Sequence, residues 1–306
     1  MTKLELIPCN LCGSDDSVLL YPSSLPEETE HIKNIQALQC TSIGYGVHGP
    51  VVRCKNCGLV YINPRPKSID VIQDYKDVVD ELYVEEREGR ALTFERHLRP
   101  LEEIAGPPNG KRLLDVGCHI GVFVDVAQRH GWDAWGVEPS RWAAEQAQAQ
   151  GLKVVSGTLA TAGLEDASFD VITLWDVIEH VPDPQGDLGH VHRLLKPGGI
   201  TVIHTIDIES LFARIMGHRW PWLMEMHLYY FSPRTLRQML KAVGFEIIHS
   251  SPQGRYLRLG YLISRLQPYS RLLYRLLDTI VTQLHLRGIA VPINLGDLFT
   301  MYARKP

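Results

Sequence analysis

Residues 113–140 constrain the fold of this chain more than any other stretch. A short apolar run at 113–116 leads into a turn that holds Gly117 and Gly121, and apolar residues at helical spacing follow. A buried strand that stops at glycines and enters a helix presents free backbone amides and a helix N-terminus to a ligand. The pattern therefore predicts the start of a parallel α/β sheet with a nucleotide site at the carboxyl ends of its strands.

The side chains around this turn distinguish between two kinds of nucleotide ligand. The dinucleotide fingerprint G-x-G-x-x-G is absent, because Cys118, His119 and Ile120 separate the two glycines. Asp115 ends the preceding run, and a carboxylate there repels a pyrophosphate but attracts the ammonium of a methionine moiety. Glu138 follows the glycine turn by about 20 residues, where such folds bind the ribose hydroxyls. These residues disfavour a dinucleotide oxidoreductase.

The stretch resembles motif I of class I S-adenosylmethionine (SAM) methyltransferases, whose usual form is acid-x-G-x-G-x-G. Asp115, Gly117 and Gly121 match this form, and His119 stands at the middle glycine. The resemblance covers residues 113–250 and continues, in the family's order, through FDVITLW (169–175), DVIEHV (176–181) and LLKPGGITVIHTI (194–206). It implies a Rossmann-like α/β fold with the seven-stranded methyltransferase sheet, and SAM as the cofactor.

The resemblance also implies which residues contact SAM. The methionine end of SAM would lie against Asp115, Gly117, Cys118 and Gly121, and the ribose against Glu138. The adenine would lie against Thr158 and Leu159, and the sulfonium against Trp175 and Asp176. Such enzymes often cover the cofactor with a helix that precedes the first strand of the sheet. Tyr75, Tyr83 and Arg90 are therefore candidate lid residues, with core packing or solvent exposure as the alternative.

Two C-x-x-C-G knuckles precede this core, one formed by Cys9 and Cys12 and one by Cys54 and Cys57. Each knuckle offers two thiolates on one tight turn, which predicts a structural zinc site with four cysteine ligands. A pair of redox dithiols is the alternative, although neither knuckle opens a βαβ unit as a thioredoxin-like motif would. The long spacer predicts an inserted loop or hairpin across residues 21–49.

The DVIEHV segment carries the richest chemistry, because Asp176, Glu179 and His180 share one face if the segment begins a helix. His180 could act as a general base toward a substrate hydroxyl. The three residues could instead hold a divalent cation such as Mg²⁺, since the pattern resembles the acid-x-x-Glu-His site of ubiquinone-biosynthesis O-methyltransferases. They could also merely orient the turn. His227, in EMHLYYFSP, is a further candidate for a base, a metal ligand or a substrate contact.

The predicted organisation has three parts: a zinc ribbon at 1–65, a helical linker or lid at 66–110, and a SAM-binding methyltransferase domain at 111–306. Within the third part, aromatic-rich residues 207–233 predict a substrate lid, and residues 255–292 predict an amphipathic helical insertion. The insertion has leucines, isoleucines and tyrosines among arginines. It could contact a membrane surface or a lipid-linked substrate, or pack against the lid or a second subunit.

Composition narrows the remaining function classes. The net charge of −4 gives no global attraction for nucleic acid, and an RNA-binding ribbon would depend on Arg53, Lys55, Arg65 and Lys67. The sequence lacks an apolar run of about 18 residues and a signal-peptide pattern at its start. We therefore expect a cytoplasmic protein with Cys40 and Cys118 as reduced thiols.

Together these features predict a SAM-dependent methyltransferase that methylates a hydroxyl oxygen with help from a histidine. The Asn/Asp-Pro-Pro-Tyr/Phe signature of amino-group methylation on bases is missing after residue 175. A zinc ribbon before such a core also resembles sugar and surface-glycan methyltransferases, so the expected acceptor is a small molecule, a sugar or a lipid-linked glycan. The alternatives are a SAM-binding protein without catalysis and a zinc-ribbon RNA methyltransferase.

Overall fold

The computed structural model describes residues 4–25 and 35–306, which build a central sheet of seven strands in the order β10-β13-β8-β7-β4-β5-β6. The strands are β4 (Arg112–Val116), β5 (Asp133–Glu138), β6 (Val154–Ser156), β7 (Phe169–Trp175), β8 (Leu195–Ile206), β10 (Glu246–Pro252) and β13 (Leu298–Arg304). The five strands from β6 to β8 run parallel, whereas β13 is antiparallel to both of its neighbours. This arrangement confirms the predicted Rossmann-like methyltransferase sheet.

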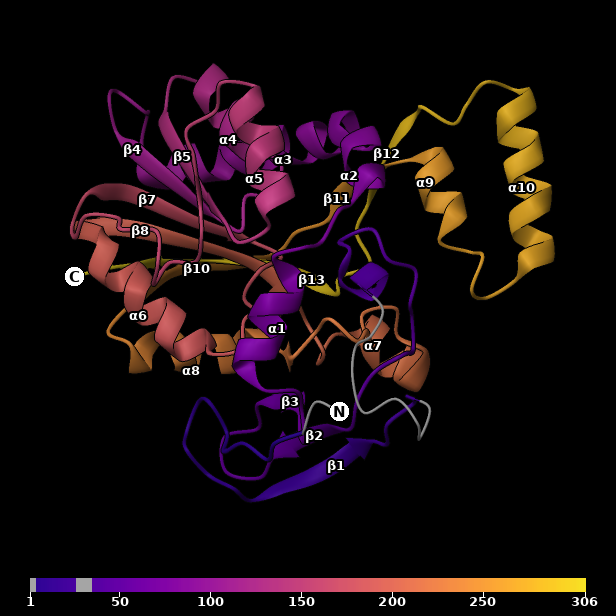
Figure 1. Cartoon of the computed structure of the whole chain (residues 1–306), viewed down its shortest axis with the longest axis horizontal. Coiled ribbons are helices and arrows are strands. Elements are labelled where there is room, and N and C mark those ends of the chain that lie inside the picture. The colour runs from indigo at the N-terminus through magenta and orange to yellow at the C-terminus, as the bar shows by residue number, and fades with distance from the viewer. Residues whose placement is uncertain (1–3, 26–34) are drawn as a thin grey trace.

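Helices cover both faces of this sheet (Figure 1). One face carries α3 (Arg87–Ala105), α4 (Val122–Arg129) and α5 (Arg141–Ala149), and the other carries α6 (Pro184–Leu194) and α8 (Pro233–Ala242). Each helix turns an apolar stripe toward the sheet, so the sheet is buried between two hydrophobic cores. The carboxyl ends of β4, β5 and β7 therefore meet at one edge of the sheet, as a ligand site requires.

The ribbon at the N-terminal end is a second sheet, built from β1 (Ser17–Tyr21), β2 (Val51–Cys54) and β3 (Val60–Ile62). Its fourth strand, β9 (Tyr229–Tyr230), comes from the segment predicted as a substrate lid. A domain boundary at residue 65 therefore cuts through this sheet. Between β1 and β2 lies the short helix η1 (Ile35–Leu38), while residues 26–34 of the predicted inserted loop lie outside the described residues.

The aromatic residues of 207–233 have a packing role that the sequence did not reveal. Trp220, Tyr229, Tyr230 and Phe231 are all buried, at 1% exposure or less. Tyr229 stacks on Tyr61 of β3, which fixes the ribbon against the larger domain. These four rings form part of the hydrophobic core and are not exposed at the surface. The same segment holds α7 (Leu211–Met216) and the short helix η2 (Gly217–Arg219).

The linker between ribbon and sheet contains α1 (Ser68–Tyr75) and α2 (Glu81–Glu85), which lead into α3. The helices predicted near 68–75 and 91–105 are thus confirmed. Asp80 caps α2 by accepting a hydrogen bond from the Tyr83 amide, and it also accepts bonds from the amide and hydroxyl of Thr41. This buried carboxylate fastens α2 to the chain that follows η1.

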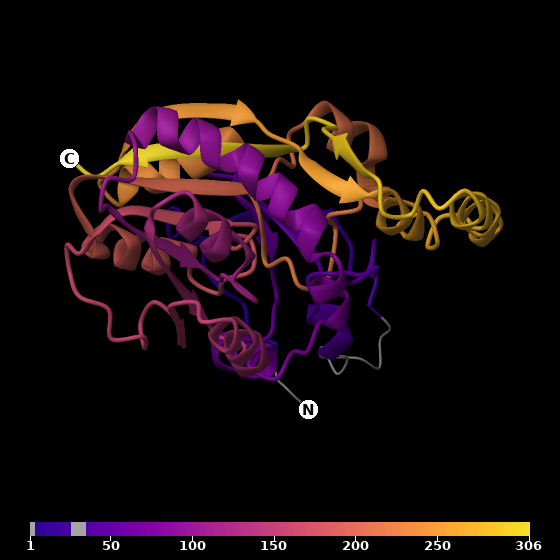
Figure 2. The same cartoon turned by 90° about the horizontal axis from the view of Figure 1, so that it is seen from above.

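The C-terminal insertion is a hairpin of two helices, α9 (Leu259–Ser264) and α10 (Arg271–Gln283). Its base is a two-stranded ladder of β11 (Arg255–Arg258) and β12 (Ala290–Ile293). Figures 1 and 2 both show α10 standing away from the body of the molecule. Across 4–25 and 35–306, none of the helices has the length and apolarity needed to span a bilayer.

Candidate active site

The turn after β4 lies at the carboxyl edge of the sheet, where the sequence predicts it. Gly117 and Gly121 have φ values of 63° and 75°, in the left-handed region that favours glycine. An added Cβ would lie 2.8 Å from a methyl group of Val177 at the first position and 2.5 Å from one of Leu152 at the second. Both glycines are therefore required by backbone conformation and by space.

Two buried carboxylates border this turn. Asp115 is 3% exposed and accepts a hydrogen bond of 2.7 Å from the Thr173 hydroxyl. Glu138 is fully buried and accepts bonds from the amides of His119, at 2.8 Å, and Ser140, at 2.7 Å. Burial raises the pKa of Asp115 to about 8 and the pKa of Glu138 to about 7. Within the described part of the chain, neither carboxyl group forms an ion pair, so a cationic ligand would be the first cation to meet them.

A stack of three side chains covers the turn from the side of α2 and α3. The ring centroids of His119 and Tyr83 lie 3.7 Å apart. The guanidinium carbon of Arg90 lies 3.6 Å from the centroid of the same Tyr83 ring. Burial lowers the pKa of His119 to about 3, so its imidazole is neutral, and its Nδ1 atom has no partner among the described residues. Tyr83 and Arg90 thus lie where lid residues are expected, whereas Tyr75 packs with Leu38 and Val78.

This environment fits SAM. The two carboxylates can accept bonds from an ammonium and from ribose hydroxyls, and the unpartnered Nδ1 of His119 adds a further polar atom. Trp175 at the end of β7 is mostly buried, and its Nε1 atom also lacks a partner among the described residues. The set of unused polar atoms is that of a site awaiting a polar ligand.

Three predicted cofactor residues lie differently from one another. Leu159 is buried in the core, and the Thr158 amide donates to the Thr161 hydroxyl within the turn after β6. Cys118 belongs to the core beneath the turn, and its sulfur fills the space over Gly136 of β5. A cofactor contact of Cys118 stays a prediction, and with the side chain in the core it would have to be made by the backbone.

The segment after β7 forms a turn and not the start of a helix, and Asp176 takes a φ of 55°. Its carboxylate contacts Nδ1 of His204 at 2.8 Å and the guanidinium of Arg255 at 3.2 Å. Burial alone would raise the pKa of Asp176, but Arg255 and His204 outweigh it and hold that pKa well below its usual range. The helical face on which Asp176 was expected to join Glu179 and His180 is not formed.

Two histidines come together next to this turn. The rings of His180 and His227 lie 4.7 Å apart. The Nδ1 atom of His180 contacts the Met226 carbonyl at 3.0 Å, and the Nδ1 atom of His227 contacts the Trp222 carbonyl at 2.7 Å. Because a carbonyl only accepts, each Nδ1 must donate, which leaves each Nε2 as a proton acceptor in the neutral ring. Burial lowers the pKa of both rings, so both are neutral near pH 7.

Glu179 completes this group. It is 1% exposed and accepts a hydrogen bond of 2.8 Å from the Thr205 hydroxyl. Burial and the nearby Asp176 raise the pKa of Glu179 to about 8. Ligand atoms of Glu179, His180 and His227 lie within 4.8 Å of one another, a spacing that could accommodate a divalent cation.

His204 and Arg255 are the site residues that sequence reasoning missed. His204 is buried near the carboxyl end of β8, and its Nε2 contacts the Gln253 carbonyl at 3.2 Å. A histidine inside the apolar run TVIHTI was the available signal, because a buried strand rarely holds an imidazole without a partner. Arg255 gave no signal, since 79 residues separate it from Asp176.

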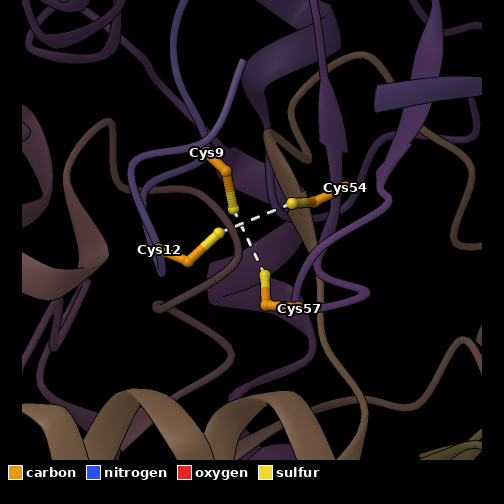
Figure 3. Close-up of side chains that lie close together, drawn as sticks. All are labelled: Cys9, Cys12, Cys54 and Cys57. Atoms are coloured by element: carbon orange, nitrogen blue, oxygen red, sulfur yellow. Dashed lines mark hydrogen bonds between the residues drawn. The ribbon is translucent and has the colours of Figure 1, made fainter. Parts of the chain in front are cut away.

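The four knuckle cysteines converge on one point in the ribbon (Figure 3). The sulfurs of Cys9 and Cys57 lie 3.4 Å apart, and those of Cys12 and Cys54 lie 3.5 Å apart. These distances are too long for disulfides, whose sulfurs are about 2.05 Å apart. Tetrahedral zinc with Zn–S bonds of about 2.3 Å separates its sulfurs by about 3.8 Å, so the cluster fits this ion.

A sequence model of the methyltransferase domain family matches residues 83–250, which is more than half of the chain. The chain belongs to this family. The match begins at Tyr83 in α2 and ends in β10, so it includes both turns of the candidate active site. The match does not include strands β1 to β3 of the ribbon, the α9–α10 hairpin or β13.

Curated relatives are similar to part of this chain, which spans about 60% of the first relative described here, and a solved structure shares its fold. The ubiquinone biosynthesis O-methyltransferase of Paracidovorax citrulli (strain AAC00-1) is 33% identical over 144 residues, which cover 40% of this chain and 60% of the relative. The enzyme of the same name from Aeromonas salmonicida (strain A449) is 28% identical over 184 residues, covering 52% of this chain and 77% of the relative. A crystal structure of a methyltransferase candidate from Bacillus halodurans C-125 has the same fold, with a TM-score of 0.51, 17% identity, and coverage of 69% of this chain and 99% of that one.

Proposed function

We propose that this protein transfers a methyl group from SAM to a hydroxyl oxygen of a small-molecule acceptor. Family membership and the unpaired carboxylates at the turn after β4 support SAM as the cofactor. The observation that carries oxygen as the target is the pair of neutral imidazoles, His180 and His227, whose Nε2 atoms are free to accept a proton. The two relatives described above are named O-methyltransferases, which supports the same choice.

Each group of residues has a defined task in this reaction. When bound, SAM supplies an electrophilic methyl group whose bond to sulfur breaks as the bond to the acceptor oxygen forms. Asp115 holds the ammonium and Glu138 the ribose hydroxyls, which orients the cofactor. The Nε2 atom of His180 or His227 takes the hydroxyl proton and later releases it to water, which regenerates the neutral ring.

The acceptor follows from the relatives only as a class. The name of these relatives favours a small molecule of ubiquinone biosynthesis as the acceptor. The zinc ribbon, by its resemblance to sugar and surface-glycan methyltransferases, suggested a sugar or a lipid-linked glycan instead. We test both by incubating the protein with SAM that carries a labelled methyl group and a panel of phenols, catechols and free sugars. Formation of a labelled ether supports the proposal. SAM binding without transfer to any acceptor would favour a non-catalytic SAM-binding protein, and transfer to added RNA would favour the RNA methyltransferase.

A second mechanism rests on the spacing of Glu179, His180 and His227. A divalent cation held by these three residues would lower the pKa of the acceptor hydroxyl, so that no base is needed. Asp176 would not be a ligand, because Arg255 and His204 already engage its carboxylate. Dialysis against EDTA distinguishes the two mechanisms. Activity that persists supports the imidazole base, whereas activity that returns on addition of Mg²⁺ or Mn²⁺ supports the metal. Activity restored by Zn²⁺ alone is assigned to the cysteine cluster.

We also propose that Cys9, Cys12, Cys54 and Cys57 hold a structural zinc ion. Binding of structural zinc is worth about 10–16 kcal/mol in small zinc domains, far more than a ribbon of three short strands gains from its own core. Metal analysis of the purified protein should give one zinc per chain, and Cys54→Ser should lose it and melt at a lower temperature. Protein without zinc that forms reversible disulfides within each knuckle would favour the redox alternative.

A further inference from the structure

We propose that the α9–α10 hairpin docks this protein on an anionic membrane surface. The hairpin lies outside the residues that the family model matches, and it contributes no strand to the seven-stranded sheet. It projects from the body in both views (Figures 1 and 2). The inference goes beyond the proposed methyl transfer and does not depend on it, because membrane binding is measured without turnover.

The first argument is a solvent-exposed apolar stripe on α10 that belongs to no hydrophobic core cluster of the described chain. Leu272, Leu276, Ile280 and Leu284 follow one another at intervals of four residues and therefore lie on one helical face. Their exposed fractions are 80%, 58%, 41% and 59%. Leu273, on the adjacent row, is 43% exposed. A continuous apolar face of this kind on a projecting helix marks an interaction surface.

The second argument is the charge of the same element. Residues 255–292 contain six arginines and one acidic residue, Asp278, whereas the whole chain has a net charge of −4. Asp278 is paired with Arg287, while Arg271 and Arg275 form no ion pair within the described residues. Both unpaired arginines are exposed and directly precede Leu272 and Leu276, so a row of positive charge runs beside the apolar stripe. A leucine face flanked by arginines is the pattern of a helix that lies in the interface of an anionic bilayer.

The charge pattern also decides against a second copy of the chain as the occupant. A twofold contact through the stripe would bring the arginine rows of both copies into one interface. Like charges in such a contact repel each other, and Asp278 cannot compensate them because Arg287 already engages it. Anionic lipid headgroups, by contrast, complement the row.

Polar contacts join the hairpin to segments that lie beside the candidate active site. Arg258 at its base forms an ion pair of 2.7 Å with Glu86, next to α2, and Arg265 donates to the carbonyls of Thr41 and Ser42 at 2.8 and 2.9 Å. A groove of about 770 Å³ lies between α9 and the helical linker of residues 66–110. Hairpin residues line one wall, and Asp80 and Leu82 of the linker line the other. A membrane at the hairpin would therefore lie beside the lid, where an amphiphilic acceptor could leave the lipid.

Flotation of the full-length protein with lipid vesicles tests the proposal. Wild-type protein should float with vesicles of phosphatidylcholine plus phosphatidylglycerol, and less with phosphatidylcholine alone. Leu276→Ser with Ile280→Ser should reduce binding at least about tenfold, because two apolar side chains no longer enter the bilayer. Arg271→Gln with Arg275→Gln should reduce binding to the anionic vesicles by about fivefold per arginine and remove its salt dependence.

A matched control replaces two exposed apolar residues elsewhere. Leu19→Ser with Ile69→Ser, at positions 55% and 66% exposed, should float like the wild type. Circular dichroism and SAM binding should be unchanged in every variant, which separates loss of docking from loss of fold. The proposal is overturned if wild-type protein floats with neither vesicle, or if Leu276→Ser with Ile280→Ser floats like the wild type. A lipid-free dimer that these two substitutions dissociate would also overturn it, in favour of a second copy.

Discussion

The turns after β4 and β7 lie at the same edge of the sheet, but the pKa values of their acidic residues are shifted in opposite directions. At the first turn, Asp115 and Glu138 are buried without a cationic partner in the described chain, so burial raises the pKa of both. At the second turn, Asp176 has two partners, Arg255 and His204, and its pKa falls well below the usual range. The first turn therefore leaves two carboxyl groups without a cationic partner, which a cationic ligand can supply, while the second has already paired its own carboxylate.

This difference assigns the two halves of the proposed reaction. A cationic cofactor is attracted to uncompensated carboxylates, which the turn after β4 provides. Proton transfer needs a neutral acceptor. The turn after β7 provides the imidazole of His180, and the 207–233 segment places the imidazole of His227 next to it, beside a carboxylate that no longer competes for protons. Substitutions at the two turns should therefore have separable effects on binding and on turnover.

The largest effect is expected from removal of the proton acceptors. If one imidazole is the base, either His180→Ala or His227→Ala should lower kcat by about 10²–10⁴-fold and leave the Kd for SAM within about threefold of wild type. Release of S-adenosylhomocysteine on the acceptor identified in the panel measures kcat, and calorimetry measures Kd. His218→Ala, at an exposed histidine, is the matched control and should keep full activity. Full turnover in both active-site variants would remove the histidines from the mechanism.

The next largest effect concerns the cofactor. Asp115→Asn should weaken SAM binding by about 10–100-fold, because a charged hydrogen bond to the ammonium is lost. Asp176→Asn should weaken it by less than about threefold, since that carboxylate already serves Arg255 and His204. Calorimetric titration of each variant with SAM provides the comparison. Equal losses in both variants would contradict the division between the two turns.

A smaller effect should appear in the pH dependence of SAM binding. The pKa of Asp115 is about 8 in the free protein, and an ammonium beside the carboxylate lowers it, so binding releases a proton. Affinity should therefore rise by about tenfold between about pH 6 and pH 7.5, and the rise should be absent in Asp115→Asn. Titrations in buffers with different ionisation enthalpies count the protons released. An affinity for SAM that falls over this pH range would show that Asp115 does not bind the ammonium.

The smallest effect concerns the ion pair at the second turn. Arg255→Gln should reduce the free energy of unfolding by about 1–2 kcal/mol, because the partly buried carboxylate of Asp176 loses one of its two partners. The melting temperature should fall by about 2–6 °C. Arg237→Gln is the control, since that side chain is exposed and forms no ion pair within the described chain, and it should melt like the wild type. An unchanged melting temperature in Arg255→Gln would show that the pair adds nothing to the fold.

Sequence reasoning was most successful where a feature is local. The alternation of short apolar runs with helical spacing located the parallel strands, and the residues between 113 and 138 identified the glycine turn and its two carboxylates. The two C-x-x-C-G knuckles likewise predicted a cysteine cluster, because each knuckle brings two sulfurs together within one turn.

Features that depend on distant contacts were not predictable in this way. The two-residue strand β9 is too short for a periodic signal. Only its pairing with β3 shows that residues 207–233 supply the fourth strand of the ribbon sheet. The spacing of Asp176, Glu179 and His180 suggested a helix, but Arg255 draws Asp176 into a different contact from 79 residues away. The direction of the Cys118 side chain depends on the gap over Gly136 in the neighbouring strand.

Calorimetric titration of the wild-type protein with SAM and, separately, with NAD tests the central claim most directly. The unpaired carboxylates at the turn after β4 should bind one SAM per chain with release of a proton, and they should exclude the pyrophosphate of NAD. Binding of NAD in the absence of any SAM binding would contradict the account of this turn and the function built on it.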